Sequence, residues 1–359
     1  MANCEQLSSE TAEEFLASME KNLVGGMVGL GVAMGMETGL FDVMISLGGE
    51  PKTSQEIADA GNFKERYVRE WLGCMTSARV VNFDPKEEKY WLPAHRSNIT
   101  ELKGLAMSAP ILCGGFLQVA ECFKRNGPPG VSNSQYPKFD ELMELTQGPW
   151  FHNKFLQEFI PSMPQIQKQL NDGIEVLDAG CGTGLSTRII AGHFPKSRFS
   201  GIDLSKPGIL EAREMATKKG LSNVEFLASD ITQLPSDWTA KFDYVFISFV
   251  LHDLTYPDKA LREMHRVLKS GGTLSIIEVN SHSKLQDNLA FEDQDRICVD
   301  FTYSLFNCLP TSLVDKDGAG LGAFMGREVG KKMLETANFE VISITEIATE
   351  SMHLMCKKP

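Results

Sequence analysis

A glycine-rich turn between a buried strand and a helix constrains this chain more than any other feature. The segment begins at Glu175 with apolar residues typical of a buried strand, and residues 185–193 after it have a helical pattern. Its glycines at positions 180, 182 and 184 allow close approach to a ligand and positive φ angles. A turn of this kind also occurs in dinucleotide-binding proteins, so by itself it leaves the ligand open.

The acidic residue at the start of the turn narrows the choice of ligand. Asp178 precedes the glycines, and its carboxylate would repel a pyrophosphate but attract a cation. S-adenosylmethionine (SAM) carries a sulfonium and an amino group, and the pattern Asp178-x-Gly180-x-Gly182-x-Gly184 resembles the first motif of class I SAM-dependent methyltransferases. The resemblance implies that SAM is the cofactor and that these four residues bind it.

The pattern from residue 173 onward predicts the fold of this part. Short apolar strands alternate with helices, which indicates a parallel sheet with crossover helices. The last two strands have only a short polar link, so we expect them to pair antiparallel. The predicted fold class is α/β, a Rossmann-like seven-stranded class I methyltransferase sheet with an N-terminal, mainly helical winged-helix domain. The expected strands are residues 175–178, 198–203, 224–227, 242–248, 273–279, 340–347 and 353–356. A turn at residues 270–272 is expected before the fifth strand.

Ligands of such sheets bind at the carboxyl ends of the strands. Asp203 ends the second strand and is followed by Leu204. Its carboxylate would accept hydrogen bonds from both ribose hydroxyls of SAM. A helix N-cap is the alternative, since Ser205 and Pro207 follow.

The next two strand ends supply further cofactor contacts. Asp230 and Ile231 end the third strand and suit an adenine, with the carboxylate accepting from the exocyclic amine and Ile231 packing on the ring. An ordinary strand-end turn is the alternative. Ser248 and Phe249 end the fourth strand and would face the methionine part of SAM.

Residues 12–100 have the helix, turn, helix and hairpin order of a winged helix, with helices at 55–60 and 64–77. The second helix mixes basic and acidic residues, which is more typical of a solvated face than of a groove reader. We therefore predict a winged-helix-like dimerisation domain at residues 1–100, with no nucleic acid as partner. Residues 101–170 would form a helical linker and pocket cover, and residues 171–359 the SAM-binding domain.

The resemblance extends to the segment Leu251-His252-Asp253, which looks like that of the winged-helix small-molecule methyltransferases. In the O-methylating members a His-Asp-Trp at this point supplies the general base, and Leu254 replaces the tryptophan here. The resemblance implies that His252 is the base. A hydrogen-bonded structural histidine is the alternative.

The insert at residues 280–326 also departs from those members, and it resembles an uncharacterised branch in which a histidine often precedes the cysteine. Asn307 stands before Cys308 here. The insert is apolar and rich in glycine near its end, so we predict a lid over the acceptor. Tyr303 is expected to join His252 in the catalytic pocket and bind the acceptor.

Composition limits the partners further. The chain has 359 residues and a net charge of −12, which argues against a nucleic-acid or anionic-membrane partner. The uncharged runs 22–36 and 104–120 fall short of the roughly 18 residues of a spanning helix, and residues 4–14 are polar and acidic. We therefore predict a cytoplasmic protein without a signal peptide, and a homodimer that buries the apolar runs.

No set of His, Cys, Asp and Glu residues has metal-ligand spacing, so no metal is expected.

The sequence thus predicts SAM-dependent methyl transfer to a small-molecule acceptor, at a hydroxyl or a thiol. Two alternatives stay open. A SAM-sensing regulator would use the winged helix to bind DNA. A nicotinamide-dependent oxidoreductase would lack the acidic residue in the turn, and it does not account for Asp230 and Ile231.

Overall fold

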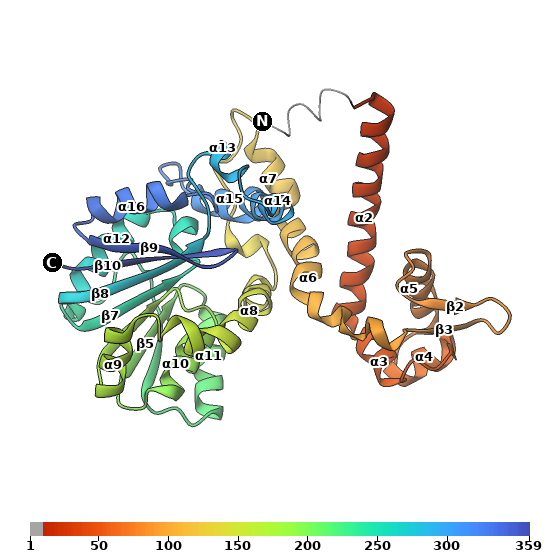
Figure 1. Cartoon of the computed structure of the whole chain (residues 1–359), viewed down its shortest axis with the longest axis horizontal. Coiled ribbons are helices and arrows are strands. Elements are labelled where there is room, and N and C mark those ends of the chain that lie inside the picture. Colours follow the sequence, from red (N-terminus) through yellow and green to blue (C-terminus); the bar gives the residue numbers. More distant parts are fainter. Residues whose placement is uncertain (1–9) are drawn as a thin grey trace. The chain divides into compact units, whose positions relative to one another are not determined.

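The computed structural model describes residues 10–359. Two compact units divide the chain, one ending at Ile111 and the other running from Leu112 to Pro359. The expectation about a signal peptide falls largely on residues 1–9, which lie outside the described part. Figure 1 labels many of the helices and strands.

The first unit has the predicted winged-helix elements. Thr53 and Glu56 form the capping box that opens α4: the Thr53 side chain accepts from the Glu56 N–H at 3.2 Å, and Glu56 accepts from the Thr53 N–H at 2.7 Å. A short strand that sequence reasoning missed joins the hairpin to give a sheet of order β1-β3-β2. The elements are α2 (Ala12–Thr38), α3 (Leu40–Ser46), β1 (Lys52–Thr53), α4 (Ser54–Gly61), α5 (Glu65–Ser77), β2 (Asn82–Asp84), β3 (Lys89–Trp91) and η1 (Ala94–Leu102).

The second unit is an α/β domain preceded by helices. The helix α6 (Lys103–Leu112) ends where this unit begins. The elements that follow are η2 (Cys113–Gly115), α7 (Phe116–Cys122), η3 (Asn133–Gln135), α8 (Phe139–Trp150), η4 (Phe151–Phe159), α9 (Pro164–Asp172), β4 (Glu175–Ala179), α10 (Leu185–His193), β5 (Arg198–Asp203), α11 (Lys206–Lys218), β6 (Val224–Ala228), η5 (Ser236–Trp238), β7 (Phe242–Ser248), η6 (Leu251–Asp253), α12 (Pro257–Val267), β8 (Leu268–Val279), α13 (Leu285–Asn288), α14 (Gln294–Tyr303), η7 (Ser304–Cys308), α15 (Leu309–Ser312), α16 (Gly326–Thr336), β9 (Glu340–Ala348) and β10 (Ser351–Lys357).

The sheet has the predicted seven strands, in the order β6-β5-β4-β7-β8-β10-β9. All neighbouring pairs are parallel except β10, which runs antiparallel to β8 and to β9. The fold class is therefore confirmed. The expected turn at residues 270–272 lies inside β8, which begins at Leu268. The register with β7 passes from Leu268 directly to Thr273, and Gly271 has a φ of 74°, so the chain turns out of the β7 ladder here. Gly271 N donates to Lys358 O at 2.8 Å.

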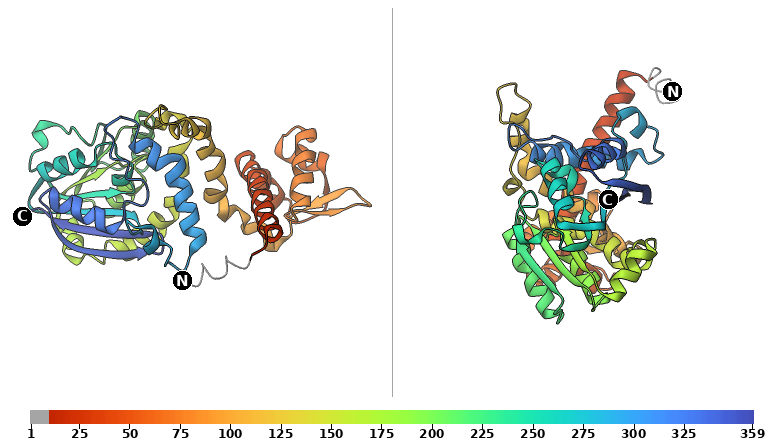
Figure 2. Two further views of the ribbon diagram at one scale, coloured as in Figure 1. Left: turned by 90° about the horizontal axis from the view of Figure 1, so that it is seen from above. Right: turned by 90° about the vertical axis from the view of Figure 1, so that its left-hand side faces the viewer.

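Helices cover both faces of the sheet. Figures 1 and 2 show α12 and α16 on one face and α9, α10 and α11 on the other. Buried residues of α12 and α16, such as Leu261 and Leu334, pack with the sheet in one apolar core, and Leu170 and Ile190 belong to the core on the opposite face. With both faces covered, the carboxyl ends of the parallel strands are the place for a ligand.

The insert is mostly helical. The helices α14, η7 and α15 follow one another without a break from Gln294 to Ser312, and the glycine-rich segment comes after them. Ser312 Oγ donates to Leu254 O at 2.9 Å and Ala319 N donates to Thr255 O at 3.0 Å. These bonds fasten the insert to the segment that follows β7.

One described helical stretch, Ala94–Cys122, has the length and apolar composition of a membrane span, and the bent pair of α2 and α3 meets the same criteria. These two helical stretches are longer than the uncharged runs at residues 22–36 and 104–120 that they contain. Length and composition are a weak indication, because core helices of water-soluble proteins share them.

Candidate active site

The glycine turn after β4 has the positive φ angles that its sequence predicts. Gly180, Gly182 and Gly184 have φ angles of 84°, 53° and 75°. A Cβ at Gly180 would lie 2.5 Å from Val250, and one at Gly184 would lie 2.6 Å from Phe226, whereas one at Gly182 would meet nothing within 4 Å. Packing therefore requires the outer two glycines, while the middle one lies beside open space.

Asp178 lies at the end of β4 beneath this turn. Its Oδ2 accepts hydrogen bonds from Ser186 Oγ and Thr187 Oγ1, each at 2.6 Å. Burial raises the pKa of its carboxyl to about 6. The two hydroxyls fix the first turn of α10, and a cation next to the carboxyl would favour its ionised form.

Asp203 connects the glycine turn to the end of β5. Its Oδ2 accepts from Gly182 N and its Oδ1 accepts from Ser205 N, both at 2.8 Å. The N-cap of α11 is Ser205, whose Oγ accepts from Gly208 N at 3.1 Å, so Asp203 does not take the N-cap role. Burial raises the pKa of Asp203. The side chain of Leu204, beside it, is 67% exposed.

The residues predicted to hold the adenine differ in exposure. Asp230 is exposed, and its Oδ1 accepts from Thr232 N and Thr232 Oγ1, both at 2.8 Å. Ile231 is only 5% exposed and packs in the core. Asp230 is thus available to a ligand, whereas Ile231 has little surface left for a ring.

The end of β7 has two unusual features. Ser248 Oγ is buried and has no hydrogen-bond partner among the described residues. Phe249 has a φ of 54°, a strained value for a bulky residue, and its N–H donates to Ile277 O at 2.8 Å. Strain of this kind is concentrated at functional sites.

Helix α8 adds two carboxylates that sequence reasoning missed. Asp140 Oδ2 accepts from Ser205 Oγ at 2.7 Å, and Glu144 Oε2 accepts from Thr183 Oγ1 at 2.8 Å. Figure 1 shows α8 beside α10 and α11, at the same edge of the sheet. With Asp178 and Asp203, these residues give the strand-end loops an acidic lining.

His252 lies in the short η6 helix that follows β7 and is 4% exposed. Its Nδ1 is hydrogen-bonded to Glu278 Oε2, and its backbone N–H donates to Glu278 Oε1 at 3.3 Å. Its Nε2 lies 3.2 Å from Asp253 Oδ1. Sequence reasoning missed Glu278, although this residue is near the carboxyl end of β8 and the strand-end rule that selected Asp203 would have found it.

The electrostatics around His252 are dominated by acids. Burial alone would lower the pKa of His252, but the carboxylates of Asp253 and Glu278 outweigh it and raise this pKa well above its usual range. Burial raises the pKa of Asp253, raises that of Cys308 to about 12, and raises that of Asp300 to about 6.

Cys308 lies in η7 of the insert, and the tertiary structure brings its sulfur to His252 and Asp253. The prediction of no metal was based on the spacing of ligand residues along the sequence. Spacing could not reveal this cluster, because Cys308 is distant from His252 and Asp253 in the chain. Tyr303 is half-buried at the end of α14, and its role in acceptor binding stays a prediction.

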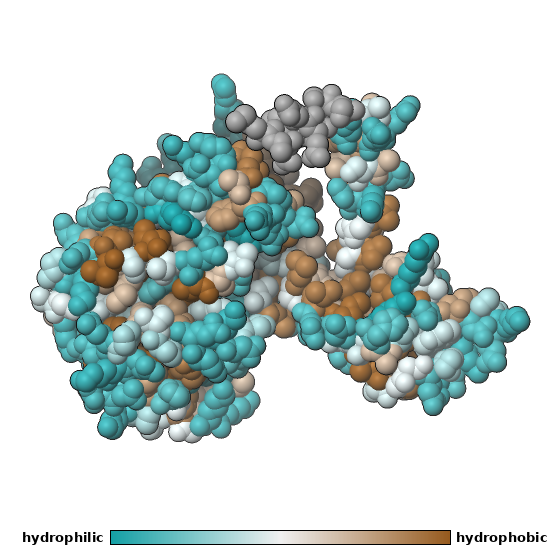
Figure 3. Space-filling view, viewed as in Figure 1, coloured by the Kyte–Doolittle hydropathy of each residue, from teal (hydrophilic) through white to brown (hydrophobic). Residues whose placement is uncertain are grey.

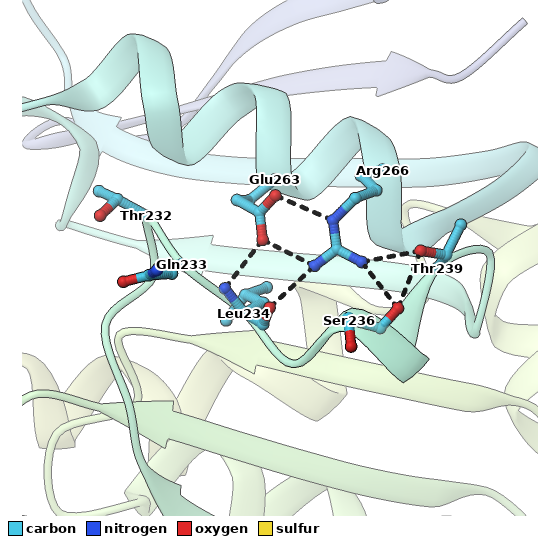
Figure 4. A pocket seen from close by; sticks show the side chains of 7 residues that line it. All are labelled: Thr232, Gln233, Leu234, Ser236, Thr239, Glu263 and Arg266. Atoms are coloured by element: carbon cyan, nitrogen blue, oxygen red, sulfur yellow. Dashed lines mark hydrogen bonds and ion pairs between the residues drawn. The ribbon is translucent and has the colours of Figure 1, made fainter.

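Figure 4 shows a separate surface hollow formed by the β6–β7 connection and α12. The guanidinium of Arg266 lines this hollow and donates to Glu263 Oε2 at 2.7 Å and to Leu234 O at 3.1 Å. Because Glu263 already pairs with the positive charge of Arg266, this hollow is not a candidate for the site of methyl transfer.

Two family descriptions match the chain. The family described as "Methyltransferase domain" matches residues 170–344, and the "Rv2258c-like winged HTH domain" matches residues 26–101. The first match overlaps the predicted SAM-binding domain, residues 171–359, over most of its length, and the second overlaps most of the predicted winged-helix domain, residues 1–100.

Curated relatives include methyltransferases of quinone biosynthesis. The chain is 35% identical over 145 residues to a demethylmenaquinone methyltransferase of Listeria monocytogenes, which covers 40% of this chain and 58% of that protein. It is 34% identical over 190 residues to a ubiquinone/menaquinone biosynthesis C-methyltransferase of Brucella anthropi, which covers 51% of this chain and 70% of that protein. The chain thus spans little more than half the length of the first of these relatives.

Solved structures match almost the whole chain. An O-methyltransferase family protein from Burkholderia thailandensis has a TM-score of 0.68 at 13% identity, covering 98% of this chain and 99% of that one. Human N-acetylserotonin methyltransferase in complex with SAM has a TM-score of 0.63 at 16% identity, covering 98% and 99%. At these identities the likeness establishes the fold.

Proposed function

This chain belongs to the SAM-dependent methyltransferases, and we propose that it transfers the methyl group of SAM to a hydroxyl or thiol of a small-molecule acceptor. One observation carries the proposal. The glycine turn after β4 and the His252–Glu278 pair lie at the carboxyl ends of adjacent strands, because β7 pairs with both β4 and β8. Gly180 also packs against Val250, two residues before His252.

The site fits the cofactor. We expect the turn with Gly182 at its centre to lie against SAM, since open space lies beside this glycine. Asp203 would accept from the ribose hydroxyls with the lone pairs that Gly182 N and Ser205 N leave free, and exposed Leu204 would pack near the base. The buried Oγ of Ser248, which has no hydrogen-bond partner among residues 10–359, suits the methionine end. When bound, SAM supplies a methyl group activated by a sulfonium.

The residues of the chain would position the acceptor and remove its proton. In-line transfer depends mainly on orientation, and an acceptor that is protonated at neutral pH also needs a base. His252 is the candidate base: Glu278 fixes its ring through Nδ1, and Nε2, which lies 3.2 Å from Asp253 Oδ1 without a hydrogen bond to it, would take the acceptor proton. Because the pKa of His252 is raised well above its usual range, its basic form is favoured as pH rises. The bonds from the insert to Leu254 and Thr255 place the insert beside this histidine, where it would exclude water.

The insert and the names of the relatives favour an apolar acceptor. Phe301 stacks on Phe324 at 3.7 Å between ring centroids, and Leu305 is partly exposed, which would suit an apolar molecule. The relatives named above are methyltransferases of quinone biosynthesis and of N-acetylserotonin by their names. We propose an aromatic or otherwise apolar acceptor for this chain as well.

We propose a homodimer built on the first unit. Helix α2 exposes a long series of large apolar side chains, and Figure 3 shows part of it. Such a surface is larger than monomeric proteins usually leave in water. The residues are Phe15, Leu16, Met19, Leu23, Val24, Met27, Leu30 and Met34.

We expect no DNA binding by the winged helix and a cytoplasmic location. The arginines of α5 are paired with glutamates of the same helix, Arg66 with Glu70 and Arg69 with Glu65. They therefore carry little net charge toward a phosphate backbone. A gel-shift experiment with duplex DNA at physiological salt checks this; retention there would favour a regulator instead.

A screen of phenols, thiols and quinols for release of S-adenosylhomocysteine tests the proposed activity, with calorimetry of SAM and NADH beside it. We expect SAM binding, no NADH binding, and product formation with at least one small acceptor. Saturable NADH binding without SAM binding would refute the proposal.

A further inference from the structure

Three side chains with metal-binding atoms meet where β7 and β8 end. An imidazole nitrogen of His252, a carboxylate oxygen of Asp253 and Cys308 Sγ all lie within 4.8 Å of one another. The first two residues belong to η6 and the thiol to η7 of the insert. We propose that this cluster binds a zinc ion and that the zinc takes a thiol acceptor as its fourth ligand; the second part rests on the proposed methyl transfer.

The ligand set and its geometry select the metal. Imidazole and thiolate are soft or borderline ligands that favour zinc over magnesium and calcium. Ligand atoms that share a tetrahedral zinc ion lie about 3.5 Å apart, and His252 Nε2 is already 3.2 Å from Asp253 Oδ1. Small side-chain rotations would bring the sulfur of Cys308 to the same spacing. Three protein ligands with an open fourth position are typical of a catalytic zinc site.

The surroundings of the cluster support a bound cation. Glu278 is hydrogen-bonded to His252 Nδ1, and both side chains are buried, with 2% and 5% exposure. A carboxylate in this position orients the imidazole of many zinc ligands. Asp253 Oδ1 is buried and lies 3.2 Å from His252 Nε2, but it makes no hydrogen bond among the described residues, so a cation held by both atoms would satisfy the carboxylate. Asp300 adds a further acidic group close enough to interact with His252.

The step that follows is balanced. A thiol binds the zinc as its thiolate and releases its proton to solvent. The sulfur then attacks the methyl carbon of SAM in line: a sulfur–carbon bond forms, the carbon–sulfonium bond breaks, and its electron pair stays on the departing sulfur. The thioether product is a weaker ligand than the thiolate and leaves. In the zinc-bound state His252 is a ligand, and the metal replaces its imidazole as the group that deprotonates the acceptor.

Metal content of the full-length chain tests the site. After chelation and reconstitution with zinc, the wild type should hold about one zinc ion per chain, whereas Cys308→Ala should hold none. Cys356→Ala is the matched control, since this buried thiol lies in β10 opposite Leu274 and should leave the zinc content unchanged. Glu278→Gln should weaken zinc binding by roughly 10–100-fold. Equal zinc content in Cys308→Ala and Cys356→Ala, or no zinc in the wild type, would overturn the site.

Activity with thiophenol tests the role of the metal. Zinc-loaded enzyme should methylate thiophenol, and removal of zinc should lower that rate by roughly 10²-fold or more without changing SAM affinity in calorimetry. Equal thiophenol methylation with and without zinc would overturn the thiol-activating role. An outcome in which neither form binds SAM would instead refute the proposed function, so the two failures can be told apart.

Discussion

Replacing Asp203 tests the cofactor site most sharply. Each of its carboxylate oxygens accepts one backbone N–H at 2.8 Å, from Gly182 and from Ser205, and keeps a further lone pair for a ribose hydroxyl. Hydrogen bonds to a charged group contribute about 1.5–3 kcal/mol each. Loss of two in Asp203→Ala should therefore weaken SAM binding by about 3–6 kcal/mol, or roughly 10²–10⁴-fold, less what water recovers.

Calorimetric titration with SAM measures this loss, and two further variants separate its causes. Asp203→Asn keeps one acceptor oxygen and should bind with intermediate affinity. Ser205→Ala removes the α11 N-cap and should cost about 0.5–2 kcal/mol of folding stability with little effect on SAM affinity. The reasoning fails if Asp203→Ala binds SAM within about twofold of the wild type, or if Ser205→Ala loses as much affinity as Asp203→Ala.

Four further predictions concern the catalytic residues, the buried acid and assembly. His252→Ala should lower turnover by roughly 10²-fold or more while SAM affinity stays nearly intact; full turnover from about pH 6 to about pH 9 would contradict this. Tyr303→Ala should raise the acceptor KM in steady-state kinetics and leave kcat close to that of the wild type; an unchanged KM would remove it from the pocket. SAM affinity should rise as pH passes about 6, where the Asp178 carboxyl ionises and attracts the sulfonium, and Asp178→Asn should flatten this rise; equal pH dependence in both proteins would argue against a contact. Light scattering should give a dimer for the wild type and a monomer for Leu23→Asp combined with Met27→Asp, and a stable wild-type monomer at micromolar concentration would refute the interface.

Local sequence determined the strands of the sheet and the conformation of the glycine turn. Strand β5 and helix α10 have the predicted bounds, Arg198–Asp203 and Leu185–His193. The glycines of the turn have the predicted positive φ angles. These features depend on residues that are neighbours along the chain, so apolar periodicity and glycine placement are sufficient to predict them. The rule that ligands bind at strand ends then selected Asp203 without any knowledge of strand order, while the motif of the turn selected Asp178 and the family resemblance selected His252.

Only the tertiary structure decided what surrounds these residues. The His252–Glu278 pair joins positions 26 residues apart, and the contact between Asp140 and Ser205 joins positions 65 apart. Cys308, in the insert, lies beside His252 and Asp253. The sequence pattern records which side of a strand or helix is apolar, but not which strand lies beside it or which helix crosses its end. Strand order, the register between β7 and β8 and the path of the insert therefore determine that His252, Asp253, Glu278 and Cys308 share one site.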